Sequence, residues 1–376
     1  MKILICTADY PPLDGDMSTV SARLARALAA LGHDVAVVAP RFPGIKGTDA
    51  AEPAEVVRYR GYRSAWLRLM PMLVTSWRSA RGCDAVLALN VASGGVCAML
   101  LRAMRGTPYV VFACGHDGMT LRNAPVLGGL LRRVYARAKA IVADSEFTRG
   151  NLVNCGVDAD RIDVVWPGAD PGVRVDKARV DAARYDYVLD GSRVILSVGR
   201  LSMRNNHVAL VRALPGILER VPNTVLLIAG RGPCMGTLCQ EARRLGVRNQ
   251  LVLPGEVGEA RLAALYAACD VFALPVGVGG GEQADGLGLA VSEAHAHAKP
   301  VVAGNSGAAP ELVLDGETGL LVESDEPGAI AGALLRILED PGLATRLGRN
   351  GRKRVEDVWN GAAFARRVAA ILERPA

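Results

Sequence analysis

The hydrophobic positions of this 376-residue chain form short runs separated by stretches with helical spacing. Between the first two runs, Val20, Leu24, Leu28 and Leu31 share one helical face, and Gly32 suits the end of that helix. The runs are apolar and rich in β-branched residues, which is typical of parallel strands covered on both faces. This alternation predicts an α/β fold. The predicted strands of the first half are residues 2–8, 34–40, 84–90, 108–114, 140–144 and 162–166.

The pattern lapses into polar and turn residues at 181–192 and then begins again. Helical spacing in the second series covers 208–220 and 329–338. Two doubly wound, Rossmann-like domains are therefore expected, at residues 1–187 and 188–358, with the site in a cleft between them. The predicted strands of the second half are residues 193–199, 224–230, 250–255, 270–275, 300–304 and 319–322.

Composition narrows the class of protein. Apolar residues make up 50% of the chain and charged residues 22%, which argues against disorder, collagen and coiled coil. No apolar run is long enough for a membrane span, and Asp9 interrupts the start before a signal-peptide core could form. We therefore expect a soluble cytoplasmic protein. The eight cysteines are scattered without a CxxC pair, which favours reduced structural thiols over a metal site or disulfides.

Positive charge is concentrated in the first half of the chain. The net charge is +6; residues 1–187 carry 24 Lys/Arg against 18 Asp/Glu, and residues 188–376 carry 20 of each. Such a field attracts an anionic acceptor, a phospholipid surface or nucleic acid, or it is a solvated face without a partner. Nucleic acid is the weakest of these, because aromatic interleaving and a recognition motif are absent. Between Glu55 and Asp117 the only acid is Asp84, against Arg58, Arg60, Arg63, Arg68, Arg78, Arg81, Arg102 and Arg105.

Residues 125–139 combine apolar and basic side chains in one helical stretch. Leu127, Leu130, Leu131 and Val134 alternate there with arginines and Lys139. The pattern fits an interfacial helix that contacts a membrane, and it fits equally a core-packed helix with a basic outer face.

Two common nucleotide motifs are missing. The turn after the first strand reads DYPPLDGDM and lacks the G-x-G-x-x-G fingerprint of dinucleotide-binding oxidoreductases. A Walker A loop is also absent from the sequence.

Two loops of the second half carry candidate phosphate-binding chemistry. Gly286 and Gly288 precede a helix that begins near Leu289, so backbone N–H groups at its N-terminus can approach a phosphate. Glu293, one turn inside, could accept two ribose hydroxyls. Arg200 and Arg204 follow the strand at 193–199, where paired hydrogen bonds to a diphosphate are favoured. A glycine-rich connector with a solvated glutamate is the plain alternative.

Taken together, the motifs resemble glycosyltransferase family 4, the retaining enzymes of the GT-B fold, and in particular its bacterial lipid-mannosyltransferase-like branch. The resemblance covers nearly the whole chain and implies two Rossmann-like domains facing a cleft, with the last helix, about 359–376, packing back on the first. The motifs, in order, are YPPLDG, GHDVAVVAP, FACGHDG, ADSEFTRGNL, RIDVVWPGAD, SVGRL, GRGP, LYAACDVFALP, DGLGLAVSEA and SGAAPELVLDGETGLLV.

The resemblance also implies roles for individual residues. The second domain would bind a nucleotide diphosphate sugar, and the first would present an anionic, lipid-linked or small glycan acceptor. Arg200 would bind the diphosphate, Asp285 the sugar hydroxyls, and His116 would lie beside the transferring carbon. Neither a metal nor a cofactor is expected, because basic side chains and a helix N-terminus stabilise the departing diphosphate. The implied donor-binding set is Gly15, Arg200, Arg204, Asn205, Gly286, Leu287, Gly288 and Glu293.

Three positions depart from the family pattern. Asp16 follows Gly15 where a second glycine is usual, Asn205 replaces a lysine, with Asn206 after it in place of glycine, and Asp285 replaces a glutamate. Three hypotheses follow. The first is an active hexosyltransferase that uses a GDP- or UDP-sugar. The second is a non-catalytic, nucleotide-binding partner or regulatory subunit. The third, a nucleotide-sugar epimerase, fits the order of the motifs less well.

Overall fold

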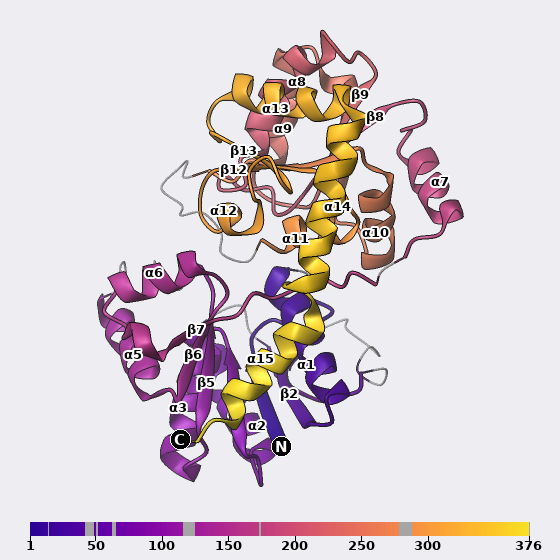
Figure 1. Ribbon diagram of the computed structural model, residues 1–376. Helices are drawn as coiled ribbons and strands as arrows, with labels where there is room; N and C mark the ends of the chain where they lie inside the picture. The colour runs from indigo at the N-terminus through magenta and orange to yellow at the C-terminus, as the bar shows by residue number, and fades with distance from the viewer. Residues whose placement is uncertain are drawn as a thin grey trace. The chain divides into compact units, whose positions relative to one another are not determined.

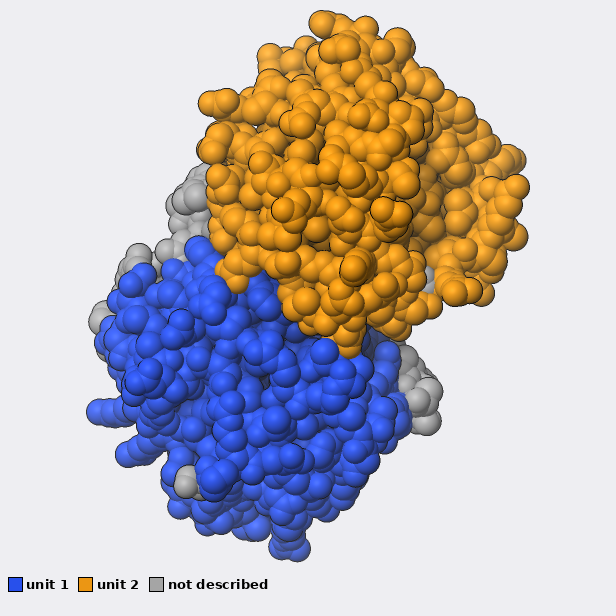
Figure 2. Space-filling model, viewed as in Figure 1, with its two compact units in different colours: residues 1–167, 361–376 blue, residues 168–360 orange. Residues whose placement is uncertain are grey.

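The chain divides into two compact units in the computed structural model, which describes residues 1–13, 15–41, 49, 52–61, 65–115, 125–172, 174–277 and 288–375. Unit 1 comprises residues 1–167 and 361–376, and unit 2 comprises residues 168–360 (Figures 1 and 2). Each unit has its own sheet and its own hydrophobic core. None of the helices in these ranges has the length and apolar character needed to cross a bilayer.

Unit 1 is built on a parallel sheet of seven strands in the order β3-β2-β1-β4-β5-β6-β7. The order reverses between β1 and β4, as in a doubly wound fold. The strands are β1 (Lys2–Thr7), β2 (Asp34–Arg41), β3 (Glu55–Arg60), β4 (Ala85–Leu89), β5 (Tyr109–Ala113), β6 (Ala140–Ala143) and β7 (Ile162–Val164).

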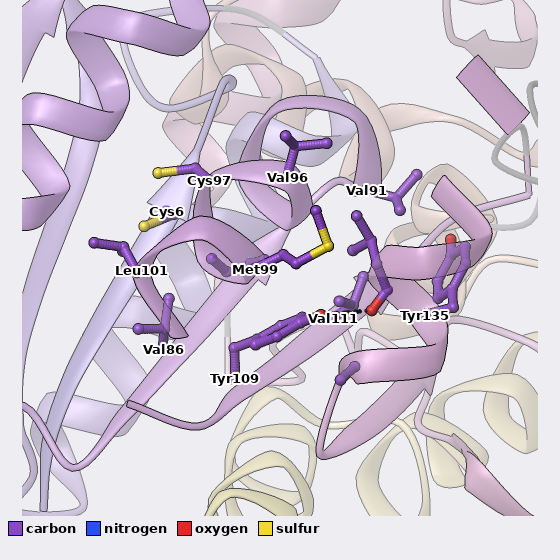
Figure 3. Packing of buried hydrophobic residues seen from close by; sticks show 14 of the residues in the cluster. Cys6, Val86, Val91, Val96, Cys97, Met99, Leu101, Tyr109, Val111 and Tyr135 are labelled. Carbon is purple, nitrogen blue, oxygen red and sulfur yellow. Dashed lines mark hydrogen bonds between the residues drawn. The ribbon is translucent and has the colours of Figure 1, made fainter. Parts of the chain in front are cut away.

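Helices cover both faces of this sheet. On one face, α2, α3 and α5 enclose a core that includes Met72, Leu101 and Tyr135, and the same cluster is seen from close by in Figure 3. On the other face, α1 and α15 pack side by side (Figure 1). The helices are α1 (Asp16–Ala30), α2 (Ala65–Ser79), α3 (Val96–Arg105), α5 (Pro125–Arg137), α6 (Glu146–Asn154) and α15 (Gly361–Glu373), with the single-turn π-helix η2 (Val91–Gly95) leading into α3.

The C-terminal helix α15 belongs to unit 1 although 193 residues of unit 2 precede it in the chain. Phe364 contacts Phe112 of β5 edge to face, with 6.0 Å between the ring centroids. Near its end, Arg374 forms two hydrogen bonds of 2.6 and 2.8 Å with the Asp163 carboxylate. Lys139 Nζ also donates to the Leu372 carbonyl at 2.9 Å. These contacts fix the last helix to the sheet of unit 1.

Unit 2 contains a second parallel sheet, of six strands in the order β10-β9-β8-β11-β12-β13. Its strands are β8 (Arg193–Val198), β9 (Thr224–Ala229), β10 (Leu251–Gly255), β11 (Val271–Leu274), β12 (Val301–Gly304) and β13 (Gly319–Val322). The helices α8 (His207–Leu218), α9 (Met235–Arg244) and α13 (Pro327–Glu339) enclose a core on one face. The remaining helices are α7 (Lys177–Asp186), α10 (Glu259–Ala268), α11 (Leu289–Ala296), α12 (Ala309–Leu312) and α14 (Pro341–Asp357).

The predicted fold class is confirmed, since both sheets are parallel and doubly wound. The division between the units falls at Pro167/Gly168, before the boundary expected at 187/188, because α7 packs on α10 within unit 2. The second crossing falls at Asn360/Gly361. Strand β3 was not predicted. It lies at the sheet edge, where Arg58 and Arg60 interrupt the apolar pattern.

Helix α5 is packed into the core of unit 1. Leu131 and Val134 are fully buried, and Leu127 and Leu130 pack against the same cluster. Arg132 and Arg133 face outward. Of the two interpretations of this stretch, the core-packed helix with a basic outer face is therefore confirmed, and the interfacial helix is wrong because its apolar side is used inside the unit.

Candidate functional site

The order of the strands in unit 2 reverses between β8 and β11, so the loops that follow these two strands diverge at the carboxyl edge of the sheet. Crevices at such switch points are where doubly wound sheets bind ligands. The loop after β8 carries Arg200, Arg204 and Asn205, and the segment after β11 leads to Gly288 and α11. Unit 2 therefore brings four residues of the predicted donor set to one edge of the sheet, with Glu293 of the same set in the first turns of α11.

The loop after β8 is held by its neighbour, the loop after β9. The Leu201 N–H donates to the Arg231 carbonyl, and the Cys234 N–H donates to the Leu201 carbonyl, both at 2.9 Å. A side chain at Gly230, whose φ is +147°, would overlap the Gly199 carbonyl oxygen. The close approach of the two backbones therefore requires this glycine.

Arg200 is the exposed cation of this loop. Its backbone is fixed, since the Arg200 carbonyl accepts from Ser202 N–H at 2.8 Å and from Asn205 Nδ2 at 2.9 Å. Among the residues described, its guanidinium forms neither an ion pair nor a hydrogen bond within the chain. A fixed backbone with an available guanidinium at a switch point suits an anionic ligand.

Asn205 stands where the family pattern has a lysine, and its side chain is only 7% exposed. Its amide group donates to the Arg200 carbonyl. It also lies beside Gly199, where a Cβ would come within 2.8 Å of Nδ2. The amide is therefore used within the loop and braces Arg200.

Asn206 joins the loop after β8 to the end of β13. Its backbone is left-handed, with φ of 49°, which asparagine tolerates better than most residues. Its Nδ2 donates to the Ser324 carbonyl at 2.7 Å and lies 3.3 Å from Asp325 Oδ1. The Gly277 N–H donates in addition to the Arg204 carbonyl at 3.1 Å. Three strand ends are thus connected through this loop.

Two serines meet at one carbonyl beyond β11. The hydroxyls of Ser306 and Ser324 each donate to the Val276 carbonyl at 2.6 Å. These serines were not predicted; the one sign in the sequence was a serine placed just after each of two strands that turn out to be adjacent. They fix the ends of β11, β12 and β13 relative to one another.

Helix α11 begins at this edge. Gly288 caps it with φ of 49°, and a Cβ at that position would overlap the Leu312 side chain, so glycine is required on both counts. Glu293 is half-buried one turn inside the helix. Because α11 connects the parallel strands β11 and β12, its N-terminus lies at the carboxyl edge of the sheet, and a helix N-terminus favours an anion.

His207 lies at the start of α8 and is buried, with 1% exposure. Neither ring nitrogen has a hydrogen-bond partner in the described part of the chain, and burial lowers the pKa of the imidazole to about 4. It is therefore neutral at pH 7 and supports the loop as an apolar group. Its place in an otherwise helical, apolar pattern gave no sign of this role.

The corresponding edge of unit 1 lies between β1 and β4. Gly15 precedes α1 with φ of 134°, and Asp16 is its exposed first residue. The departure at Asp16 therefore places a carboxylate at a helix N-terminus, where it stabilises the helix. After β4, Asn90 Oδ1 accepts hydrogen bonds from Ser93 and from the Gly94 N–H and holds a tight turn into α3, which the sequence analysis did not identify.

Several predicted residues lie outside the described ranges. These are His116, Asp285, Gly286 and Leu287. Within the ranges that are described, no group of three or more His, Cys, Asp or Glu side chains has the arrangement of a metal site. All eight cysteines are free thiols.

The comparisons with known proteins agree with this architecture. Residues 17–173 match the model described as Glycosyltransferase Family 4, and residues 183–354 match the model described as Glycosyl transferases group 1. The fold and the two matches define a GT-B glycosyltransferase, and the chain belongs to this family. It is an enzyme of the transferase class that uses a nucleotide sugar.

Relatives of similar length include a GDP-mannose-dependent α-(1-6)-phosphatidylinositol monomannoside mannosyltransferase of Mycolicibacterium smegmatis. It is 32% identical, over 98% of this chain and 98% of the relative. The protein of the same name from Mycobacterium tuberculosis is 31% identical, over 99% and 98%. A glycogen synthase of Mycobacterium tuberculosis is 27% identical, over 99% and 94%.

Solved structures share the fold across the whole chain. Anabaena Alr3699/HepE in complex with UDP and glucose has a TM-score of 0.83 at 20% identity, with 99% of each chain covered. Sucrose-phosphate synthase from Thermosynechococcus elongatus has a TM-score of 0.81 at 20% identity, with 98% of each chain covered. At 20% sequence identity, this similarity shows that the fold is shared.

Proposed function

We propose that this enzyme transfers mannose from GDP-mannose to a mannoside linked to an anionic phospholipid, with retention at the anomeric carbon. The observation that carries the proposal is similarity over the full length to mannosyltransferases named for GDP-mannose and a phosphatidylinositol mannoside. The carboxyl edge of unit 2, with Arg200 and the start of α11, supplies chemistry suited to the diphosphate.

In the proposed donor site, Arg200 and Arg204 bind the diphosphate and Glu293 accepts the ribose hydroxyls. Backbone groups of Gly286, Leu287 and Gly288 approach the phosphate, as does Gly15 from unit 1. Charge that develops on the departing diphosphate is stabilised by the two guanidinium groups and the start of α11, so that neither a metal nor a cofactor is required.

The transfer step is assigned to residues whose positions the structure does not describe. Asp285 binds the sugar hydroxyls, and His116 lies beside the transferring carbon. The acceptor hydroxyl attacks from the side of the leaving group through an oxocarbenium-like transition state, and the glycosidic bond forms as the bond to the diphosphate breaks. The acceptor proton passes to the departing diphosphate.

Asn205 supports the donor site in a different way from the lysine of the family pattern. Because its amide is engaged with the Arg200 carbonyl, we assign it a positioning role, and the second cation of the site comes from Arg204. With lysine replaced by Asn205, the site is rearranged, and the enzyme retains its activity.

The proposed acceptor explains the excess of positive charge in the first half of the chain. An anionic lipid headgroup is attracted by such a field. The proposed place of action is the cytoplasmic face of a membrane, where a water-soluble donor and a lipid-linked acceptor meet.

Calorimetric titration with GDP, UDP and ADP, without added metal, tests the donor. We expect selective binding of GDP, weakened about a hundredfold in Arg200→Ala because a charge-assisted paired contact is lost. Arg346→Ala, an exposed arginine of α14, is the matched control. Selective binding of UDP would exclude the proposed donor, and equal binding by Arg200→Ala would remove Arg200 from the diphosphate site.

Transfer to a phosphatidylinositol mannoside then tests the acceptor. Product formation from GDP-mannose, with the anomeric configuration read by NMR, is the expected result. An inverted product would contradict retention, and a product only with water-soluble glycans would contradict the lipid acceptor.

A further inference from the structure

We propose that a cavity at the amino edge of the sheet of unit 1 binds a small, water-soluble ligand that carries two or more linked phosphate groups. The cavity, called here the amino-edge cavity, has a volume of about 490 Å³. It belongs to unit 1 alone, so the inference does not depend on the proposed transfer reaction. The residues that line it are Arg102, Pro108, Ala136, Arg137, Ala138, Lys139, Arg161 and Pro375.

The cavity lies where helices α3 and α5 end and where strands β5, β6 and β7 begin. Pro375, which follows α15, adds the end of the chain to the lining (Figure 1). Because all the strands are parallel, this edge is opposite to the carboxyl edge, where doubly wound sheets bind their substrates. A ligand in the amino-edge cavity would therefore bind away from the expected acceptor site.

Positive charge is concentrated around this cavity. Among the described residues that line it, four of eight are cationic and none is acidic. None of these four cations takes part in an ion pair within the described ranges. Asp158 and Asp160 are exposed and do not line the cavity, and Asp163 is already paired with Arg374. Unpaired cations around one cavity repel one another, and a bound anion relieves this repulsion.

Tyr109, at the start of β5, is affected by the same charges. Its hydroxyl donates to the Val134 carbonyl at 2.6 Å. Burial raises the pKa of this phenol to about 12, while Arg102, Arg137 and Arg161 all act to lower it. Cations from α3, from α5 and from the segment before β7 therefore act together on one point of unit 1.

Two of the cations are held in place by the end of α5. The Arg161 guanidinium donates to the Ala136 carbonyl at 2.8 Å and to the Ala138 carbonyl. The Arg102 guanidinium donates to the Arg137 carbonyl. These bonds satisfy carbonyls that a helix end leaves without partners, and each guanidinium has more N–H groups than the bonds use. A cation that is already fixed loses little freedom when an anion binds, which favours affinity.

The other two cations keep most of their donors. Lys139 Nζ donates to the Leu372 carbonyl at 2.9 Å and has further N–H groups. Arg137 is exposed, and its guanidinium forms neither a hydrogen bond nor an ion pair with the described part of the chain. The Arg137 side chain is thus available to a ligand, and its replacement removes no contact of the fold.

Charge and size together indicate the class of ligand. Guanidinium groups make paired hydrogen bonds to phosphate oxygens. A single phosphate group carries at most about two negative charges at pH 7, against four cations here. The volume lies within the range of about 300–1,000 Å³ that is usual for small-molecule sites. Single-stranded nucleic acid fits less well, because the described lining has no aromatic side chain on which a base could stack.

Calorimetric titration with tripolyphosphate tests the proposal, using the Arg200→Ala protein so that the proposed donor site contributes little. We expect one bound ion per chain, held at least about tenfold more tightly than inorganic phosphate, because the longer anion engages more of the cations. Adding R137E should weaken binding at least about tenfold, since a cation of the site is replaced by an anion. R366E is the matched control: it makes the same charge change at an exposed position of α15 outside the cavity and should bind as before.

Hydrogen exchange locates the bound ion. Tripolyphosphate should slow exchange in peptides that cover residues 102–108, 136–139 and 159–163, and should have no such effect in R137E. Urea unfolding checks that R137E and R366E are folded. Because neither measurement needs transfer activity or GDP, failure here and failure of the proposed reaction are distinguishable.

Three outcomes would overturn the inference. These are no saturable binding of tripolyphosphate, equal binding by R137E, and slowed exchange only at the carboxyl edge of either sheet. Two further results would name a different ligand and overturn the soluble one. Binding of a single-stranded oligonucleotide but not of tripolyphosphate, lost in R137E, would assign the cations to nucleic acid. Binding only to vesicles with a phosphorylated headgroup, lost in R137E, would assign them to a lipid.

Discussion

At the carboxyl edge of unit 2, backbone conformation and close packing determine the residue type at more positions than side-chain chemistry does. Gly230 permits contact with the Gly199 backbone, and Gly288 combines a left-handed backbone with contact to Leu312. The glycines of the SVGRL, GRGP and DGLGL motifs are therefore needed for the loops to pack, whichever ligand binds there, because a Cβ would push the loops apart. Any contact with a ligand through side chains then comes from the few side chains that project from these loops.

His207 leads to a prediction of pH dependence. Burial lowers its pKa to about 4, while an unfolded histidine titrates near 6.5. Between these values the unfolded state binds more protons, so the free energy of unfolding falls as the pH falls from about 6.5 to about 4. His207→Leu should flatten this fall by up to about 1.4 kcal/mol per pH unit.

Denaturant unfolding at several pH values between 7.5 and 4 measures this slope. His295 and His297 have pKa values lowered to about 4 by burial and contribute in the same direction, so part of the slope should persist in the variant. Parallel curves for the natural protein and His207→Leu would contradict the prediction.

At the scale of the elements, the loop after β8 acts as a connector between strand ends. Asn205 braces Arg200, and Asn206 reaches the end of β13. The loop is therefore ordered by polar contacts to neighbouring loops as well as by its own turn. Changes at these asparagines should alter stability and donor binding together.

Two substitutions of Asn206 separate its contributions. Asn206→Gly keeps the left-handed backbone and loses the bonds to Ser324 and Asp325, at a cost of about 1 kcal/mol. Asn206→Ala loses the same bonds but keeps a Cβ at φ of 49°, where alanine is less favourable than glycine by about 1 kcal/mol, so it should be the less stable of the two variants. Urea unfolding measures both, and GDP titration should show weaker binding in each. Equal stability of Ala and Gly variants would show that the backbone conformation relaxes.

The sequence predicted some elements better than others, for physical reasons. Central strands such as β1 and β8 have apolar residues on both faces, so their runs stand out. Edge strand β3 alternates arginines with apolar residues and was missed. In the site, motif matches placed Arg200 and Gly288 correctly on their loops. The Ser306 and Ser324 contacts to Val276 were beyond prediction, because they join segments far apart in the chain.

For the whole molecule, the return of the chain to unit 1 determines how truncation acts. A chain that ends at residue 360 lacks α15, so unit 1 loses the contact of Phe364 with Phe112 and the buried side chains Val368 and Leu372. Each of these buried side chains contributes about 1.5–3 kcal/mol, so unit 1 should lose its cooperative unfolding transition while unit 2 keeps its own.

Differential scanning calorimetry of the truncated chain tests this expectation. The control is a chain that ends at residue 372, which lacks the Arg374 pair with Asp163 and should lose only about 1 kcal/mol. If the chain that ends at 360 kept both transitions, α15 would not be part of the cooperative core of unit 1.

The two crossings between the units also touch each other. Gly168 lies against the Trp359 carbonyl so closely that a side chain would overlap it, and Ala169 pairs with Asn360 as an isolated β-bridge. In topological terms, residues 168–360 are an insertion whose ends meet, carried by a host formed from the two terminal segments. Grafting the equivalent segment of a relative between residues 167 and 361 therefore tests the proposed division of roles. If unit 2 binds the donor, as proposed, the donor preference of the chimera should follow the graft while its acceptor stays the same.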